Sequence, residues 1–157
     1  MATILIDKPI PNFSFTTTQQ ENCKFSDLKG SNVILYFYPK DNTPGCTTEG
    51  LDFNHHFTQF KRLNTIILGV SRDSIKSHQN FITKHQFKFD LISDPEEKIC
   101  KLFDVIKEKN MYGRKVMGIE RSTFLIDSKG ILRYAWRKIK VPNHIENVLT
   151  TLKTIIL

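Results

Sequence analysis

The chain has few cysteines, and their spacing excludes several classes of protein. Only Cys23, Cys46 and Cys100 occur among its 157 residues. These positions match neither a disulfide framework, nor a CxxC redox pair, nor the paired ligands of a zinc site. Isolated thiols are typical of a reducing compartment, so we predict a cytoplasmic protein that needs no metal and no other cofactor.

Long apolar runs and a recognisable leader are also missing. No stretch reaches the ~20 apolar residues that span a bilayer, and residues 1–8 lack the basic start and apolar centre of a signal peptide. We therefore expect no membrane association. A content of 39% hydrophobic and 25% charged residues is typical of globular proteins, and no repeat or linker divides the chain. This predicts a single domain over residues 1–157.

The balance of charge is basic, with a formal net charge of +7. A basic domain can gain affinity for nucleic acid by releasing counterions, but here the lysines and arginines are spread along the chain. Solvated faces explain such a distribution, and nucleic-acid binding is disfavoured. A non-enzymatic basic binding or chaperone module stays open as an alternative.

The hydrophobic pattern predicts an α/β fold in which strands and helices alternate. Its implied architecture is a central mixed sheet with helices on both faces and an N-terminal β-hairpin. The predicted strands cover residues 13–17, 23–25, 33–38, 65–71, 89–92, 123–127 and 131–136. The predicted helices follow Cys46, run from Asp73 or Ser74 to Gln86, cover 95–103 with Asp94 as the N-cap, and cover 144–157; residues 104–117 are expected to form a loop.

Cys46 stands where a reactive thiol would be expected. Pro39 ends the apolar strand before it, Pro44 and Gly45 form a turn, and a helix begins around Cys46. A helix N-terminus favours the thiolate, which is the nucleophilic form of cysteine. Most free cysteines are small buried hydrophobes, but a turn of threonine, proline and glycine is a poor place for core packing. We interpret Cys46 as a nucleophile.

Two motifs carry a resemblance to a known family. The first has the spacing Pro-x-x-x-Thr-x-x-Cys over Pro39, Thr43 and Cys46, and the second places Arg121 in the stretch 118–127, Gly-Ile-Glu-Arg-Ser-Thr-Phe-Leu-Ile-Asp. Together they resemble a peroxiredoxin. The stretches 35–47 and 69–74 resemble in particular the bacterioferritin comigratory, or Q-type, subfamily, and the similarity extends over almost the whole chain. The resemblance implies a thioredoxin-like fold and thiol-dependent reduction of hydrogen peroxide or organic hydroperoxides.

The resemblance also implies roles for the motif residues. Arg121 is the fixed cation that favours the thiolate, and Pro39 shields that thiolate from water. Attack on an O–O bond places negative charge on the leaving oxygen, so preorganised donors lower the barrier. The candidate donors are Thr43 and the backbone N–H groups of Gly45 and Cys46.

Several residues keep a simpler interpretation beside the functional one. In the simpler interpretation Thr43 acts only as an N-cap, and Glu49 stabilises the helix dipole instead of taking part in the active-site region. His55 and His56 lack metal-ligand spacing and are interpreted as structural or solvated.

The thiol that would regenerate Cys46 is missing from its usual places. Many Q-type relatives have a resolving cysteine five residues after the nucleophile, where this chain has Leu51, or on the next helix, near Ile82. Cys100 is a possible resolving residue but fits a buried thiol better, and Cys23 is a weaker candidate. We therefore expect a one-cysteine mechanism in which glutathione, a glutaredoxin or thioredoxin reduces the sulfenic acid. Q-type relatives are often monomers, and we expect the same here.

Two other enzyme classes fit the sequence poorly. A thioredoxin-like disulfide reductase needs a second cysteine close after Cys46, where Thr47, Thr48 and Glu49 stand instead. A cysteine hydrolase needs a histidine base, and nothing in the sequence places His78, His85 or His144 near Cys46.

Overall fold

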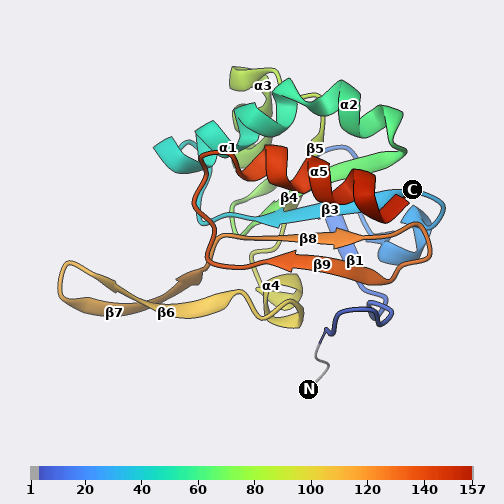
Figure 1. The fold of residues 1–157 in the computed structure, drawn as a ribbon. Coiled ribbons are helices and arrows are strands. Elements are labelled where there is room, and N and C mark those ends of the chain that lie inside the picture. The colour runs from blue at the N-terminus through green and yellow to red at the C-terminus, as the bar shows by residue number, and fades with distance from the viewer. Residues whose placement is uncertain (1–3, 157) are drawn as a thin grey trace.

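The computed structural model describes residues 4–156, which form a seven-stranded mixed sheet and a separate two-stranded sheet (Figure 1). The strand order in the large sheet is β2-β1-β5-β4-β3-β8-β9, and β6 pairs with β7. The strands are β1 (Ser14–Thr17), β2 (Cys23–Lys24), β3 (Asn32–Phe37), β4 (Thr65–Ser71), β5 (Asp90–Ser93), β6 (Ile106–Met111), β7 (Arg114–Ile119), β8 (Ser122–Ile126) and β9 (Leu132–Trp136). The helices are the 3₁₀ helix η1 (Phe25–Leu28) and α1 (Pro44–His55), α2 (Phe57–Arg62), α3 (Ile75–His85), α4 (Lys98–Leu102) and α5 (His144–Ile156). Residues 1–3 and 157, which the predicted domain and last helix include, lie outside the described residues.

The centre of the sheet is built from strands whose residues are apolar on both faces. All six residues of β3 are buried, because β3 pairs in parallel with β4 on one side and antiparallel with β8 on the other. Strands covered on both faces read as continuous apolar runs, which is why the sequence pattern identified β3 and β4 correctly.

Successive residues of β3 belong to two different cores. Ile34 and Tyr36 pack with α1, α2, α3 and α5, whereas Leu35 and Phe37 pack with α4 and the N-terminal strands. Figure 1 shows α1, α2, α3 and α5 above the sheet and α4 below it. This alternation follows from the two-residue period of a strand. The expected mixed sheet with helices on both faces is confirmed.

Both predicted hairpins of the large sheet are present. The N-terminal one pairs Phe15 with Cys23, and the later one pairs Thr123 with Trp136 in the antiparallel ladder of β8 and β9. The helix cap predicted before α3 is also present, since the Ser74 side chain accepts a hydrogen bond from the Ser77 N–H.

The loop predicted for residues 104–117 is wrong, because most of this segment forms the hairpin of β6 and β7. Its strands pair from Ile106 with Ile119 to Met111 with Arg114, and Figure 1 shows the hairpin extending away from the large sheet. Tyr112 and Gly113 have φ angles of 53° and 79°, which a tight two-residue hairpin turn requires. Most side chains of the hairpin face water on both sides, so no alternation of apolar residues marked it as a strand pair.

Two predicted helices have different bounds in the structure. The helix expected over residues 95–103 is only α4, Lys98–Leu102, because Glu97 has a φ of 62° and interrupts the chain before it. The predicted N-cap is wrong as well, because Glu97 and not Asp94 is the N-cap residue of α4. The Asp94 carboxylate nevertheless accepts hydrogen bonds from the N–H groups of Ile99 and Cys100 in the first turn of this helix.

The helix expected after Cys46 divides into α1 and α2 at His56, whose ψ of 9° departs from the helical value. Leu51 on α1 is 42% exposed and does not contribute to the core. Among the described residues, no helix combines the length and apolarity that crossing a bilayer demands.

Candidate active site

Cys46 lies in the first turn of α1, as the sequence predicts. Pro44 is the first helical residue, and Thr43 is the N-cap residue with extended backbone angles. The N–H of Thr47 donates to the Thr43 carbonyl at 2.9 Å, so the N–H groups of Gly45 and Cys46 come before the first bond of the helix. The Cys46 side chain is therefore at the positive end of the helix dipole, although the residue is only 2% exposed.

Strand pairing brings Arg121 to the same end of the sheet. Phe37 at the end of β3 pairs with Ser122 at the start of β8, and Arg121 immediately precedes that strand. Its guanidinium Nη2 donates to the Cys46 sulfur at 3.3 Å. A cation that does not titrate thus contacts the thiol from a position far away in the sequence.

Gly45 leaves room for this contact. A Cβ added at Gly45 would lie 3.1 Å from Nη2 of Arg121, which is tighter than an ordinary van der Waals contact. The guanidinium therefore packs directly against the backbone at the start of α1.

Glu49 holds the other side of the guanidinium. Its Oε1 accepts a hydrogen bond from Nη1 of Arg121 at 2.5 Å, so Arg121 bridges Glu49 and Cys46. Glu49 is fully buried, and its Oε2 has no hydrogen-bond partner among the described residues. Of the two interpretations of Glu49, the contact supports a place in the active-site region.

Burial and the ion pair with Arg121 have opposite effects on the pKa of Glu49. Desolvation raises the pKa of Glu49 from 4.5 to about 7, although the charge and hydrogen bond of Arg121 act in the opposite direction. Glu49 therefore changes its charge near neutral pH, which alters how much of the Arg121 charge is left for Cys46.

Thr43 and Pro39 lie in the segment that joins β3 to α1. The Thr43 hydroxyl does not cap the helix with a side-chain bond; it donates instead to the Lys40 carbonyl at 2.8 Å. The hydroxyl oxygen can still accept a hydrogen bond, and the residue is half-buried. Pro39 is also half-buried and follows the last residues of β3.

The other two cysteines are not grouped with Cys46. Cys46 belongs to the core on the face of α1 and α5, whereas Cys100 belongs to the core on the opposite face of the sheet. Burial raises the pKa of the Cys100 thiol well above its usual range, and the Asp94 carboxylate raises it further. Cys23 in β2 is half-buried and bonds to the Gln20 side chain.

Two buried histidines have partners that the sequence did not reveal. His144, at the start of α5, bonds through Nε2 to the Thr123 hydroxyl at 2.9 Å. Burial, together with the charge of Arg121, lowers the pKa of His144 to about 4, so this imidazole is neutral at pH 7. His78 on α3 bonds to Asp41 at 2.7 Å, beneath the segment that leads to Cys46. No periodicity marks such pairs, because the partners come from different elements.

The base of the β6 and β7 hairpin adds a second cation to this region. The Lys109 ammonium donates to the Ile119 carbonyl. Burial lowers the pKa of Lys109, the nearby Arg121 lowers it further, and Cys46 acts in the opposite direction. No pattern in the sequence marked Lys109 as a site residue, because its segment was expected to form a loop.

These features define a class of protein. A cysteine at a helix start, a fixed cation on its sulfur and a mixed sheet of this strand order are the parts of a thiol-dependent oxidoreductase with a thioredoxin-like fold. The missing second cysteine beside Cys46 distinguishes it from disulfide reductases.

Comparisons with known proteins identify the family within that class. The AhpC/TSA family matches residues 6–135. Peroxiredoxin Bcp of Xanthomonas campestris is 59% identical over 79% of this chain and 78% of its own, and that of Bacillus subtilis is 48% identical over 96% of both. A structure of a cysteine-to-serine mutant of peroxiredoxin Q from Xylella fastidiosa has a TM-score of 0.92, with 47% identity over 98% of both chains. The chain belongs to the AhpC/TSA family, as a peroxiredoxin of the Bcp or Q type, and it is a thiol-dependent peroxidase.

Proposed function

We propose that Cys46 is the nucleophile that reduces hydrogen peroxide and organic hydroperoxides in this protein. The thiolate attacks one peroxide oxygen, so that an S–O bond forms and the O–O bond breaks. The sulfur is oxidised to a sulfenic acid, and the leaving oxygen takes a proton and departs as water or an alcohol. The observation that carries this proposal is the 3.3 Å contact between Arg121 and the Cys46 sulfur at the start of α1.

The surrounding groups supply what this step needs. Arg121 and the helix dipole favour the thiolate, and both are fixed before the peroxide arrives. The N–H groups of Gly45 and Cys46 donate to the peroxide oxygens as negative charge develops there. The Thr43 hydroxyl, whose hydrogen goes to the Lys40 carbonyl, accepts from the O–H of the peroxide. Pro39 lies on the strand side of the same segment and limits the access of water.

Glu49 acts through Arg121. By accepting the Nη1 hydrogen bond it fixes the plane of the guanidinium, which leaves Nη2 directed at the sulfur. We assign Glu49 as a positioning residue because its contact is with Arg121 and not with the thiol.

Regeneration takes place by a one-cysteine mechanism with an external thiol. That thiol attacks the sulfenic sulfur, an S–S bond forms and water leaves; a second thiol then breaks the mixed disulfide and releases Cys46 as a thiol. Leu51 and Ile82 occupy the positions where a resolving cysteine would be expected, and Cys100 lies on the other face of the sheet. Thioredoxin, a glutaredoxin or glutathione is the reductant.

A two-cysteine mechanism through Cys100 is the alternative. A disulfide needs its two Cα atoms within ~7 Å, which two residues on opposite faces of a sheet reach only if one of them leaves its helix. The raised pKa of Cys100 also disfavours the thiolate that must attack.

Organic hydroperoxides are included among the substrates because of one relative. The bacterioferritin comigratory protein of Xanthomonas campestris has been studied for its alkyl peroxide reduction activity, and its structure matches this chain with a TM-score of 0.88 and 50% identity over 92% of both chains. A cytoplasmic location and a monomeric state stay predictions from the sequence.

The decisive experiment measures the consumption of hydrogen peroxide and of cumene hydroperoxide, with dithiothreitol as reductant. We expect activity in the parent protein and none above background in Cys46→Ser, while Cys23→Ser retains full activity as the matched control. Activity that survives the replacement of Cys46 contradicts the proposal.

A further inference from the structure

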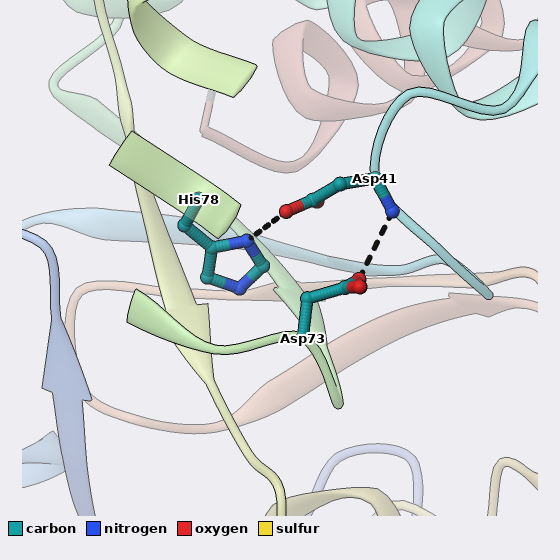
Figure 2. Close-up of side chains that lie close together, drawn as sticks. All are labelled: Asp41, Asp73 and His78. Atoms are coloured by element: carbon teal, nitrogen blue, oxygen red, sulfur yellow. Dashed lines mark hydrogen bonds and ion pairs between the residues drawn. The ribbon is translucent and has the colours of Figure 1, made fainter. Parts of the chain in front are cut away.

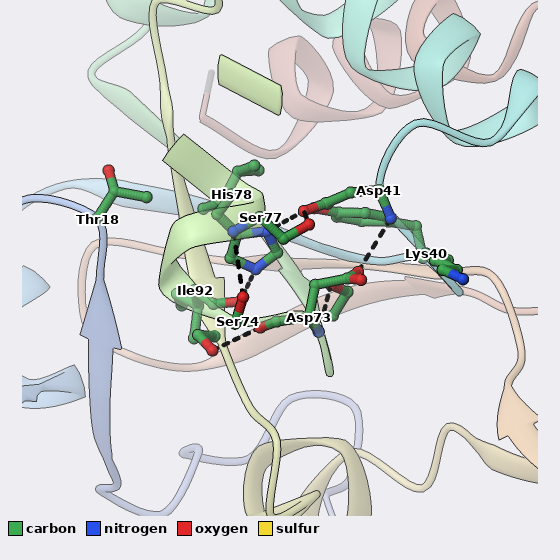
Figure 3. Close-up of polar contacts among 12 residues, drawn as sticks. Thr18, Lys40, Asp41, Asp73, Ser74, Ser77, His78 and Ile92 are labelled. Atoms are coloured by element: carbon green, nitrogen blue, oxygen red, sulfur yellow. Dashed lines mark hydrogen bonds and ion pairs between the residues drawn. The ribbon is translucent and has the colours of Figure 1, made fainter. Parts of the chain in front are cut away.

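A cluster of polar side chains surrounds Asp41, five residues before Cys46 in the segment that joins β3 to α1 (Figures 2 and 3). Oδ1 of Asp41 accepts a hydrogen bond from the Tyr38 hydroxyl at 2.6 Å. Oδ2 accepts one from the Ser77 hydroxyl at 2.8 Å and lies 2.7 Å from Nδ1 of His78. Asp41 is 5% exposed, and the contacts of its carboxylate come from Tyr38, which directly follows β3, and from two residues of α3.

The His78 ring is fixed on both of its nitrogens. Nε2 faces the carbonyl oxygen of Ile92 at 2.9 Å, and a carbonyl can only accept, so Nε2 carries a hydrogen. A neutral imidazole would then present a bare Nδ1 to the Asp41 carboxylate. Two atoms that only accept hydrogen bonds would repel each other at 2.7 Å, so a hydrogen lies between Nδ1 and Oδ2. This shared hydrogen connects α3 to the segment before Cys46.

The same atoms resemble a metal site only by their proximity. The ligand atoms of Asp41, Asp73 and His78 lie within 4.8 Å of one another. However, Oδ2 of Asp73 accepts hydrogen bonds from the Asp41 N–H at 2.9 Å and from the Ser71 hydroxyl at 2.6 Å. Together with the contacts of Asp41, these bonds use the lone pairs that a cation would need, so we interpret the cluster as a hydrogen-bond network.

The network fixes the backbone that leads to the nucleophile. Asp41 is held by its side chain on α3 and by its N–H on Asp73, and the next residue, Asn42, has a φ of 62°. Asparagine adopts this left-handed conformation more readily than most residues, so Asn42 lets the chain turn sharply directly after the fixed Asp41. Thr43 and the first turn of α1 follow at once, so the positions of Thr43 and Cys46 depend on where Asp41 is held.

We propose that Asp41 and His78 form a positioning pair that holds the segment before Cys46 closed. The closed segment keeps the sulfur against Arg121 for the reaction with peroxide, and it also keeps Cys46 buried, with 2% of the residue exposed, and so covered from an external thiol. This inference rests on the proposed function. Loosening the pair therefore has opposite effects on the two halves of the cycle: slower oxidation of Cys46 and faster attack by a thiol on its sulfenic acid.

Asp41→Ala tests this inference by single-turnover measurements of each half-reaction. Rapid quenching and mass spectrometry follow the oxidation of Cys46 by hydrogen peroxide, and then the addition of glutathione to sulfenic acid formed with one equivalent of peroxide. We expect oxidation to slow by about tenfold or more, since small misplacements of a reacting group have large effects, and glutathione addition to become several times faster.

Asp41→Asn is the conservative variant. Its amide oxygen can accept from Tyr38, and its amide N–H can donate to a bare Nδ1 of His78, so the tie survives without the shared proton. We expect both rate constants to stay within about threefold of the parent values.

Asp94→Ala controls for a general loss of stability. Asp94 is as buried as Asp41, at 5% exposed, but its carboxylate accepts hydrogen bonds from α4 on the opposite face of the sheet. We expect it to lower the melting temperature without changing the ratio of the two rate constants. If Asp41→Ala does not fold, Ser77→Ala removes a single hydrogen bond to Asp41 and is expected to give smaller changes of the same signs.

Two results overturn the positioning pair. One is that Asp41→Ala, or Ser77→Ala where Asp41→Ala does not fold, leaves both rate constants unchanged. The other is that both rate constants change in the same direction in these variants. Failure of the proposed function is distinct, because the parent protein would then show no oxidation of Cys46 by peroxide.

Discussion

Nη2 of Arg121 contacts the sulfur of Cys46 at 3.3 Å, although 75 positions separate the two residues in the chain. The contact exists because β8 pairs with β3 in a register that places Arg121 beside the start of α1. The same guanidinium bonds to Glu49, so one side chain connects the nucleophile with a buried carboxyl group.

Arg121→Lys is expected to lower the rate constant for oxidation of Cys46 by peroxide by about 10²-fold. A lysine ammonium is a point charge and cannot span Glu49 and Cys46 as the planar guanidinium does. The measurement is the second-order rate constant with hydrogen peroxide. Arg133→Lys, at a half-buried arginine in β9, is the control and should leave the rate unchanged.

Glu49→Gln and Glu49→Ala separate the position of Arg121 from the charge of Glu49. Glutamine keeps an oxygen that accepts from Nη1, so we expect activity within about threefold of the parent. Alanine leaves the guanidinium without this acceptor and is expected to reduce activity at least tenfold. Equal losses in both variants would show that the negative charge, and not the position of Arg121, matters.

The raised pKa of Glu49 predicts a specific dependence of stability on pH. Between 4.5 and about 7 the folded protein keeps the proton that the unfolded chain has lost. The contribution of Glu49 to stability is therefore complete below pH 4.5 and is lost as the pH rises through about 7. The free energy of unfolding that is lost amounts to about 3 kcal/mol. Denaturant titrations of the parent and of Glu49→Gln should show that the difference in their free energies of unfolding decreases over this range.

Gly45→Ala should reduce the rate of oxidation several-fold. The new Cβ would lie 3.1 Å from Nη2, so the end of the Arg121 side chain must move away from its place beside the sulfur. Thr48→Ala changes an exposed residue of the same helix and should be neutral for oxidation. An unchanged rate in Gly45→Ala would mean that the guanidinium moves without effect on the thiol.

The position of Cys100 predicts that it takes no part in turnover. After treatment with one equivalent of peroxide, the parent protein and Cys100→Ser should both carry an oxidised Cys46 and no intramolecular disulfide, as measured by mass under non-reducing conditions. A disulfide in the parent that disappears in Cys100→Ser contradicts the one-cysteine mechanism.

Leu51→Cys is expected to create a resolving thiol. Leu51 is 42% exposed on α1, five residues after Cys46, so a thiol there is accessible. The first turns of α1 must unwind before the two sulfurs can bond, because a helix holds these Cα atoms beyond the ~7 Å limit. Peroxide should then give an intramolecular disulfide that thioredoxin reduces. Thr48→Cys, three residues closer to the helix start, is the matched variant, and it tests whether the disulfide depends on a thiol at position 51.

The sequence by itself determined the local structure around the nucleophile. The strand before Cys46, the turn of Pro44 and Gly45 and the start of α1 depend on neighbouring residues, so their pattern predicted them correctly. The α/β order and the two hairpins of the large sheet were predictable for the same reason. The exposed β6 and β7 hairpin was not, because strands in water on both faces lack an apolar alternation.

The tertiary structure alone decided which distant groups meet. The register of β3 and β8 joins Arg121 to Cys46 and Glu49, and the packing of α3 joins His78 to Asp41. The sheet also separates Cys46 from Cys100, which the spacing of cysteines along the chain cannot reveal. Such contacts depend on strand register and on the face from which a helix packs, and both are properties of the whole fold and not of any local segment.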